Sequence, residues 1–458
     1  MQKHTKIFLA VLGVLLAARL AVMGVAPVFD PSESRYAAIS ANMSRSGDFT
    51  VPRFTHEGTY QPFKGKPPLL FQMGGAACRV FGTSEFAVRL PSFLAFGALL
   101  ALVFSTAGAL GGRDRALAAT AVCASAVSLY ALAGFCMTDM LLTLAVAGAV
   151  LLYARFDHDR ARPAGYGVFA LLGVGMLVKG PVALVLFGLP VFVWTLVNRR
   201  WETARRLPWT GGLLLFLAVC VPWYARMACL DDGFLRYFFV NENLLRFLVH
   251  DYGDKYGAGR ETFRGMAAVW MLVTALPWTL PALPVFCGRG RPRTNPFAGP
   301  GSLFVTGCAA ITAFWCLTSR VPLTYVAPAV PLFAVALALR AEPARILRLF
   351  PAAAVICVVA LCGTFLYTGA FTDKLPGGLF RRIDRALPDA ARVAFVGAQP
   401  YSAEFNLHDH LAPVISPELN VLVRTRKLHK FGLSCRPVLM QENGWSLLGP
   451  ENEKGTRN

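Results

Sequence analysis

Residues 138–181 read TDMLLTLAVAGAVLLYARFDHDRARPAGYGVFALLGVGMLVKGP, and the pattern in this stretch decides the fold. Two apolar runs, 138–155 and 164–178, flank a short arginine-rich loop. A backbone that crosses a bilayer must satisfy its own hydrogen bonds, because the hydrocarbon core holds no water, and an apolar helix of roughly 20 residues does so. The stretch therefore predicts two transmembrane helices joined by a tight turn.

Similar apolar runs recur along most of the chain. Of the 458 residues, 55% are hydrophobic and only 16% are charged. We predict an all-α polytopic membrane protein with about eleven transmembrane helices, since each run approaches the membrane-spanning length. The expected spans are 6–26, 88–110, 116–134, 138–155, 164–178, 180–198, 209–226, 264–286, 302–318, 322–340 and 347–369. The first is interpreted as an uncleaved span, because its apolar part exceeds the roughly 7 to 15 residues of a signal peptide.

The loops between the expected spans separate by charge. Alternate loops are rich in arginine, at 111–115, 154–162, 198–206, 287–293 and 340–348. Cytoplasmic loops of membrane proteins carry the excess of Lys and Arg, so these loops are placed inside and the alternate loops outside. The net charge of +19 lies largely in such loops, and no basic face with interleaved aromatic residues indicates nucleic-acid binding.

The first outer loop, residues 27–87, is long enough to suggest a function of its own. We expect it to carry two interfacial helices that lie along the membrane surface. Ser32 is expected to cap the first helix and Gly47 to end it. The second helix is expected between Pro67 and Gly82.

The segment after residue 370 has a different pattern from the rest. Residues 392–415 and 419–428 are typical of short strands and turns. We therefore predict two domains, a transmembrane domain at 1–370 and a small extracytoplasmic α/β domain at 371–458.

Charged residues follow the first expected span. Asp30 and Glu33 stand three residues apart and can share a helical face, with Arg35 and Tyr36 beside them. Such a group suits a polar site that holds an anion at the membrane edge. The same residues also fit a purely local structure, an Asx turn followed by an acid at a helix N-terminus.

Three further charges lie on the expected outer side, beside apolar segments. Asp139 opens an otherwise apolar span, a costly position that suggests a function, although with Thr138 it also fits a helix cap. Lys66 and Lys179 each precede a proline near the start of an apolar helix. A lysine at such a place either binds a lipid phosphate or only extends to the interface.

Other motifs narrow the chemistry. The sequence has no Walker A, dinucleotide-binding, zincin or nucleophile-elbow motif, so it does not support ATP-driven chemistry or serine hydrolysis. Arg246 and His250, in the outer loop at 227–263, are candidate substrate contacts. The HDH triplet at 408–410 is of a kind that occurs by chance in loops, and we predict no metal site there.

A series of short motifs, taken in order, resembles a known family. The motifs are PSESRYAAISANMSRSGDFTVPRF (31–54), GKPPLLF (65–71), FGTSEFAVRLPSFLAF (81–96), TDMLLT (138–143), LVKGPVAL (177–184), GFLRYFFVNENLLRF (233–247) and TYVAPAVP (324–331). Together they are similar to the GT-C membrane glycosyltransferases of the aminoarabinose-transferase and protein O-mannosyltransferase superfamily. The similarity covers about residues 28–335.

The resemblance implies a GT-C-like fold and a sugar transfer at the periplasmic face of a bacterial inner membrane. The sugar, such as 4-amino-4-deoxy-L-arabinose, would pass from a polyprenyl-phosphate carrier to lipid A, a glycolipid or a protein. We expect an inverting displacement in which the carrier phosphate leaves and nearby cations stabilise its charge. A protein O-mannosyltransferase-like enzyme is one alternative. A lipid or solute transporter, with polar groups near the bilayer midplane, is an alternative of another class.

The resemblance also implies roles for single residues. The family motif Asp-Glu-x-Arg-Tyr reads Ser32-Glu33-Ser34-Arg35-Tyr36, so the acid role falls to Glu33, with Asp30 as a stand-in and Asp139 as the second acid. The expected carrier-phosphate contacts are Arg35, Lys66, Lys179 and Tyr325, and the expected substrate contacts are Tyr36, Arg246 and His250.

Two departures from the family pattern concern metal binding. The family often has an acid before the motif lysine and a histidine in the outer loop, where this chain has Gly65 and Asn243. The resemblance therefore does not support a bound divalent metal or another cofactor.

Overall fold

Two compact units make up the protein. The computed structural model describes residues 2–56, 59–246, 249, 256, 261–287, 297, 301–368, 376–388, 390–397, 399–412 and 415–451. Unit 1 comprises Met1–Val22, Lys64–Leu70 and Arg89–Leu361, and unit 2 comprises Met23–Phe63, Phe71–Val88 and Cys362–Asn458. Unit 2 thus combines most of the first loop with the tail, and the predicted domain boundary after residue 370 stays a prediction.

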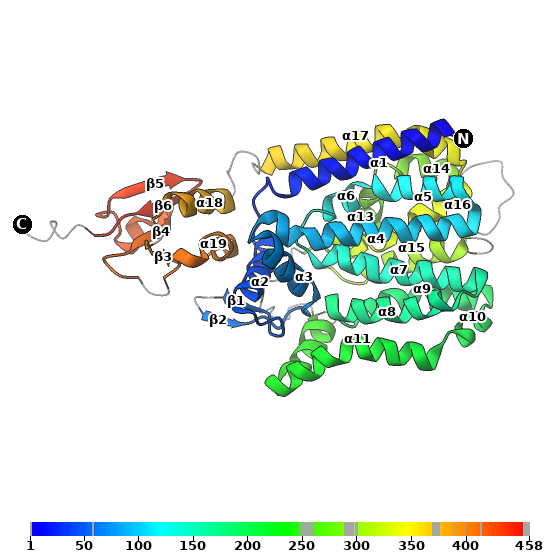
Figure 1. The fold of residues 1–458 in the computed structure, drawn as a ribbon, viewed down its shortest axis with the longest axis horizontal. Helices are drawn as coiled ribbons and strands as arrows, with labels where there is room; N and C mark the ends of the chain where they lie inside the picture. The colour runs from blue at the N-terminus through cyan, green and yellow to red at the C-terminus, as the bar shows by residue number, and fades with distance from the viewer. Residues whose placement is uncertain are drawn as a thin grey trace, which may run out of the picture. The chain divides into compact units, whose positions relative to one another are not determined.

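Unit 1 is built of helices that pack side by side (Figure 1). The helices are α1 (Gln2–Met23), α4 (Glu85–Gly111), α5 (Arg113–Ala124), α6 (Val127–Leu132), α7 (Thr138–Asp159), α8 (Arg162–Lys179), α9 (Val182–Asn198), α10 (Trp201–Arg206), α11 (Trp209–Leu230), α13 (Met266–Thr274), α14 (Thr279–Cys287), α15 (Ser302–Cys316), α16 (Ala329–Arg340) and α17 (Pro343–Thr368). A π-helical segment, η1 (Arg236–Leu245), and a 3₁₀ turn, η2 (Leu323–Val326), belong to the same unit. Helix α8 packs between α7 and α11, and α15 packs against α9 and α16.

The hairpin predicted from residues 138–181 forms α7 and α8. Arg160 ends α7 in the left-handed conformation, with a φ of 56°, and α8 begins with Pro163 in its first turn, where no amide hydrogen is required. Of the most apolar 18-residue stretch of α7, 83% is buried within the protein, which explains why this helix is apolar on all sides. The antiparallel pairing brings the start of α7 and the end of α8 to the same end of the hairpin.

The long apolar helices agree with a membrane protein. By length and composition, α1, α4, α7, α11 and α17 could each cross a bilayer, and the bent pair of α13 and α14 would add one more. Helices α9, α15 and α16 are apolar but shorter. The described ranges therefore confirm a mostly helical fold with several apolar spans, and the count of about eleven spans stays a prediction.

The expected spans at 264–286 and 116–134 are each divided into two α-helices. Residues 264–286 form α13 and α14, which are bent by 108° where one straight helix was expected. Pro277 lies at this break. Proline lacks an amide hydrogen and disfavours a helical conformation in the residue before it, so a straight helix cannot continue through this position. Residues 116–134 divide into α5 and α6 at Ser125, whose hydroxyl donates a hydrogen bond to the carbonyl of Ala121 at 2.6 Å.

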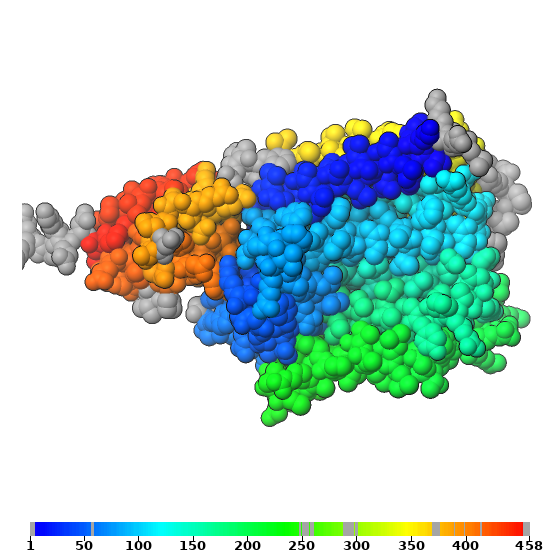
Figure 2. All heavy atoms as spheres, viewed as in Figure 1, coloured from blue at the N-terminus to red at the C-terminus, as the bar shows by residue number. Residues whose placement is uncertain are grey.

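Helices α1, in dark blue, and α17, in yellow, run together in unit 1 (Figure 2). The rings of Phe8 and Phe350 join the two helices at 5.5 Å. Large apolar side chains on both helices remain exposed, among them Val14 on α1 and Val355 and Val359 on α17. An exposed apolar face of this kind fits a lipid surrounding.

Unit 2 combines short helices with two small sheets. Its elements are α2 (Ser32–Ser46), β1 (Arg53–His56), β2 (Thr59–Pro62), α3 (Leu69–Phe81), α18 (Pro376–Ala386), β3 (Val393–Val396), α19 (Tyr401–Asn406), η3 (His408–His410), β4 (Asn420–Arg424), η4 (Thr425–Lys427), η5 (His429–Phe431), β5 (Val438–Glu442) and β6 (Trp445–Leu448). Strands β1 and β2 form an antiparallel hairpin. The second sheet has the order β3-β4-β6-β5, in which β3 and β4 are parallel and the other pairs antiparallel.

The tail sheet has an apolar core with Phe380 and Ile383 from α18 and Trp445 from β6. The strands predicted within 392–415 and 419–428 are present as β3 and β4. Sequence reasoning missed β5 and β6. Their signal was the Asn443-Gly444 pair, both with positive φ, since Asn-Gly is the preferred turn of a tight hairpin.

Helix α2 differs from the expected interfacial helix. Every residue from Glu33 to Met43 is buried, whereas a helix lying on a membrane would keep one face open. The expected surface position of α2 is therefore wrong, because α19 and β1 pack against it. The expected cap at Ser32 is also wrong, because Pro31 holds the capping position and no side chain forms a capping hydrogen bond. Gly47 ends α2 with a φ of 76°, as predicted.

Candidate functional site

A buried ion pair joins Asp139 to Lys179. Lys179 Nζ lies 2.8 Å from Asp139 Oδ1, and the two side chains are only 7% and 4% exposed. Asp139 lies in the first turn of α7 and Lys179 in the last turn of α8, positions where the helix dipoles favour an acid and a base respectively. The hairpin thus brings together two residues that the sequence analysis named separately.

The turn after Lys179 depends on glycine. Gly180 has a φ of 79°, and a Cβ atom there would lie 2.7 Å from the ring of Phe238 in η1. Glycine alone therefore lets the end of α8 approach η1 so closely. The Lys179 side chain also contacts η2. Its ammonium lies 4.1 Å from the centre of the Tyr325 ring, which is a cation–π contact.

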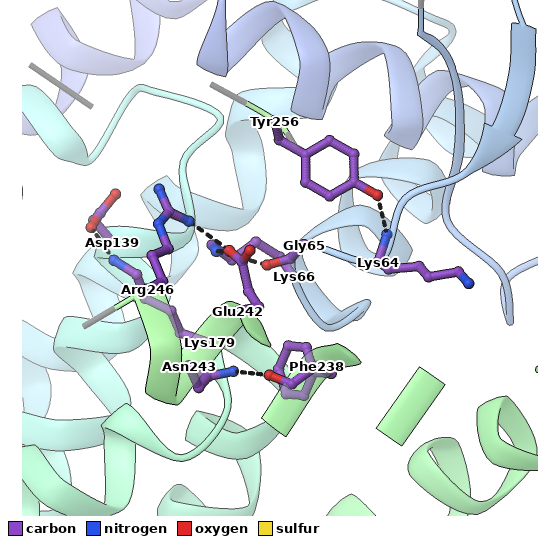
Figure 3. A network of polar contacts seen from close by, with 10 residues as sticks. All are labelled: Lys64, Gly65, Lys66, Asp139, Lys179, Phe238, Glu242, Asn243, Arg246 and Tyr256. Carbon is purple, nitrogen blue, oxygen red and sulfur yellow. Dashed lines mark hydrogen bonds and ion pairs between the residues drawn. The ribbon is translucent and has the colours of Figure 1, made fainter. Parts of the chain in front are cut away.

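A second charge cluster forms around Glu242, in η1 (Figure 3). Glu242 Oε1 accepts a hydrogen bond from Lys66 Nζ at 2.7 Å and another from Arg246 at 2.6 Å. Lys66 Nζ also donates to the carbonyl of Gly65 at 2.7 Å. Two cations therefore share one carboxylate, which leaves a net positive charge.

These clusters border a cavity of about 480 Å³ in unit 1. The lining residues are Lys66, Lys179, Pro181, Val182, Val185, Phe239, Glu242, Asn243, Leu244, Arg246, Phe314, Trp315, Thr318, Arg320, Pro322 and Tyr325. Among these described residues Glu242 carries the one carboxylate, whereas lysines and arginines supply several cations. The cavity has apolar walls and a cationic lining, a combination that suits an anionic headgroup attached to an apolar chain.

The residues at the two metal-related positions do not fit a divalent ion. Asn243 donates its Nδ2 to the carbonyl of Phe238 at 2.7 Å, so its amide serves the backbone of η1. Gly65 has only a carbonyl to offer, and that carbonyl accepts from Lys66. Across the ranges that the structure describes, no three His, Cys, Asp or Glu side chains gather as metal ligands.

In unit 2, Arg35 lies among aromatic rings. Its guanidinium carbon is 5.5 Å from the centre of the Tyr36 ring, 5.3 Å from that of Phe63 and 5.6 Å from that of Tyr401. Arg35 and Tyr36 are both buried. Tyr401 comes from α19 in the tail, so the tail contributes to a cluster that sequence analysis placed in the first loop alone.

The two acids of the first loop have different surroundings. Glu33 is buried, and its Oε2 accepts a hydrogen bond from the backbone N–H of Phe29 at 3.0 Å. Asp30 Oδ1 accepts from the hydroxyl of Ser34 at 2.5 Å and from the N–H of Ser402 at 3.1 Å, and Oδ2 accepts from the hydroxyl of Ser402. Asp30 thus links the first loop to the tail.

A buried acid of the tail, Glu404, was not predicted. Its carboxylate accepts hydrogen bonds from Asn42 Nδ2 at 2.8 Å and from the Thr55 N–H at 2.9 Å. Burial raises the pKa of the Glu404 carboxyl above its ordinary value, because desolvation disfavours the charged form more than these bonds favour it. No sequence motif marks Glu404, whose partners are more than 300 residues away.

The predicted site residues thus fall into two groups. Lys66, Asp139, Lys179, Arg246 and Tyr325 lie in unit 1, and Asp30, Glu33, Arg35 and Tyr36 lie in unit 2. His250 lies outside the described residues. Sequence reasoning missed Glu242 and Arg320; the spacing of Glu242 and Arg246, four residues apart, was the available signal for the first.

Parts of the chain are similar in sequence to known proteins. Residues 65–225 match the family described as dolichyl-phosphate-mannose-protein mannosyltransferase. The chain is 27% identical over 263 residues to an undecaprenyl phosphate-alpha-4-amino-4-deoxy-L-arabinose arabinosyl transferase of Edwardsiella ictaluri, covering 55% of this chain and 44% of that protein. A second such transferase, from Pseudomonas fluorescens, is 31% identical over 250 residues, 52% of this chain and 44% of that protein. The matches therefore span less than half the length of these relatives.

The fold is also that of solved membrane proteins. ArnT from Cupriavidus metallidurans, in its apo state, superposes with a TM-score of 0.79 at 17% identity, covering 96% of this chain and 97% of that chain. An oligosaccharyltransferase from Archaeoglobus fulgidus gives a TM-score of 0.51 at 12% identity, covering 89% and 64%. The fold is that of ArnT, a GT-C membrane protein. In sequence, the chain is similar to the arabinosyl transferases and, over residues 65–225, to the mannosyltransferase family.

Proposed function

We propose that this protein is a glycosyltransferase that takes its sugar from a polyprenyl-phosphate carrier. The observation that carries the proposal is the cavity of about 480 Å³, where Lys66, Lys179 and Arg246 face a space with apolar walls. A lipid phosphate has the matching chemistry, an anion on an apolar chain. A relative of the same fold was solved with undecaprenyl phosphate bound, which supports this choice of ligand.

The proposed reaction is a displacement at the anomeric carbon of the sugar. The acceptor oxygen forms the new bond as the bond between the sugar and the carrier phosphate breaks, and the electron pair leaves with the phosphate. Lys66, Arg246 and Lys179 stabilise that growing negative charge. Asp139 holds Lys179 in place, and Arg35 remains a proposed phosphate contact on the strength of the family motif.

The role of the proposed acids depends on the acceptor. With a hydroxyl acceptor, Glu33 or Asp139 takes the proton as general base. With a phosphate acceptor, as on lipid A, no proton has to be removed, and the carboxylates orient the amino sugar or the acceptor. We favour 4-amino-4-deoxy-L-arabinose as the sugar, because similar transferases carry it in their names. Lipid A is the favoured acceptor because the family resemblance implies it.

The proposed setting is a bacterial inner membrane with about eleven spans. The first outer loop and the tail then face the periplasm, where lipid-linked sugars meet envelope acceptors. The arginine-rich loops support this orientation.

Reconstitution with defined substrates tests the proposal. The purified protein in liposomes receives undecaprenyl phosphate-linked 4-amino-4-deoxy-L-arabinose and lipid A, and mass spectrometry follows the glycosylated product and the released carrier. Stoichiometric formation of both supports the assignment. Movement of lipid across the bilayer without a glycosyl product would instead identify a transporter.

A protein acceptor is the second candidate, because the matching family of residues 65–225 is described as a protein mannosyltransferase. The same liposomes receive a polyprenyl-phosphate mannose and a Ser/Thr-rich peptide. Glycosylation of the peptide, with lipid A unchanged, would select this second candidate.

A further inference from the structure

The tail helix α19 packs against the first-loop helix α2 within unit 2. At this contact Ser402 is fully buried and donates two hydrogen bonds to Asp30, one from its N–H and one from its hydroxyl. Asp30 stands three residues before Glu33, the acid proposed to act on the acceptor. The tail is therefore bonded to the segment that starts the family motif.

The residue before Ser402 contacts the motif arginine. The Tyr401 ring lies 5.6 Å from the guanidinium carbon of Arg35 and 5.7 Å from the ring of Phe54. A cation over an aromatic face within about 6 Å is held by the ring's negative face. Tyr401 thus restricts the positions that the Arg35 guanidinium can take.

A third link lies one turn further along α19. Glu404 accepts hydrogen bonds from Asn42 in α2 and from both the N–H and the hydroxyl of Thr55 in β1. It therefore joins the tail to two elements of the first loop. A helix as short as α19, with six residues, is not stable alone. The order of α19 therefore depends on its partners in the first loop, and the order of those partners depends on α19.

We infer that the tail is a positioning element for the first-loop site, in which Tyr401 and Ser402 fix Arg35 and Asp30. Without them the Arg35 guanidinium would sample several orientations, and carrier binding would require it to be ordered first. The expected effect on carrier binding rests on the proposed function. The mechanical coupling of tail and loop does not depend on that function.

The coupling is tested by hydrogen–deuterium exchange on the full chain. Tyr401→Leu removes the ring, and Ser402→Ala removes the hydroxyl donor to Asp30. We expect faster exchange of the amides of residues 32–46 in both variants, with exchange in α7 and α8 unchanged. Phe431→Leu, an aromatic-to-leucine change at an exposed tail position, serves as the matched control and should leave α2 unchanged.

Kinetics with the liposome assay tests the consequence. Tyr401→Leu should raise the apparent KM for the carrier-linked sugar on the order of tenfold, with the KM for the acceptor unchanged. Tyr401→Phe keeps the aromatic ring and should therefore have the KM of the wild type. A merely structural role would lower the amount of folded protein without this selective change in KM.

Each outcome decides between the two proposals. Unchanged exchange in residues 32–46 would overturn the coupling, whether or not the protein transfers sugar. Faster exchange with an unchanged carrier KM would leave the transferase standing and overturn the positioning role. A wild-type protein that binds no undecaprenyl phosphate and makes no product would overturn the proposed function, and the exchange result would still judge the coupling.

Discussion

Lys179 and Asp139 lie 40 residues apart in the chain, yet their side chains form an ion pair of 2.8 Å inside unit 1. Lys179 also faces the Tyr325 ring and the cavity. Burying two charges is costly, and a buried pair contributes less to stability than a well-packed apolar pair would. A pair retained in such a place is better explained by function than by stability.

Single and double substitutions separate those two roles. Asp139→Asn leaves Lys179 buried without its carboxylate, and Lys179→Met leaves Asp139 without its cation. Each single change should cost about 3 to 5 kcal/mol of stability. The double variant removes both charges and should regain most of that stability, measured as thermal unfolding in detergent. It should nevertheless fail to transfer sugar, because the cavity has lost a cation. Wild-type transfer by the double variant would show that the pair is only structural.

Lys66 and Lys64 form a matched pair for testing the phosphate contact. Lys66 lines the cavity beside Glu242, whereas Lys64, two residues earlier, forms an ion pair with Asp231. A hydrogen bond involving charged groups contributes about 1.5 to 3 kcal/mol, so Lys66→Met should raise the apparent KM for the carrier on the order of 10- to 100-fold. Lys64→Met should change it little. Equal effects of both substitutions would point to general surface charge in place of a specific contact.

Glu33 and Asp30 should differ in which kinetic constant they change. A general base contributes about 10²- to 10⁴-fold to rate, so Glu33→Ala should lower kcat by that order when the acceptor is a hydroxyl. With lipid A, where the carboxylate orients the amino sugar or the acceptor, kcat should also fall. In both cases the folded protein should remain in the membrane. Asp30→Asn disturbs the bonds to Ser34 and Ser402 and should mainly raise the carrier KM. The measurement is a full kinetic analysis of both variants. An unchanged kcat in Glu33→Ala would remove Glu33 from the proposed chemistry.

Glu404 should make the stability of unit 2 depend on pH. Because its pKa is raised by burial, the folded state keeps the proton over a pH range in which the unfolded state has lost it. Stability therefore falls as pH rises from the ordinary Glu pKa through the raised one. Glu404→Gln should flatten this dependence. The unfolding temperature of the variant should therefore rise relative to that of the wild type as pH increases through this range. Parallel curves for the two proteins across that range would contradict the sign.

The candidate site could be predicted only in part. Asp139, Lys66 and Lys179 were identifiable because a charge at the end of an apolar run is costly and therefore informative. Glu242 was not, since the π-helical segment that turns it toward Lys66 carries no signal as strong as an apolar period. Tyr401, Ser402 and Glu404 were also missed, because their partners in the first loop are more than 340 residues away in the chain.

The sequence by itself determined that this chain is a helical membrane protein with arginine-rich loops, because apolar run length and loop charge act locally and do not depend on how the helices pack. It also predicted where α2 ends, since only glycine adopts the conformation at residue 47 without strain. The tertiary structure alone decided that α2 is buried on all sides, that Asp30 bonds to Ser402, and that two cations share Glu242. Those features depend on contacts between distant segments, and the free energy of such contacts arises only when the chain has folded.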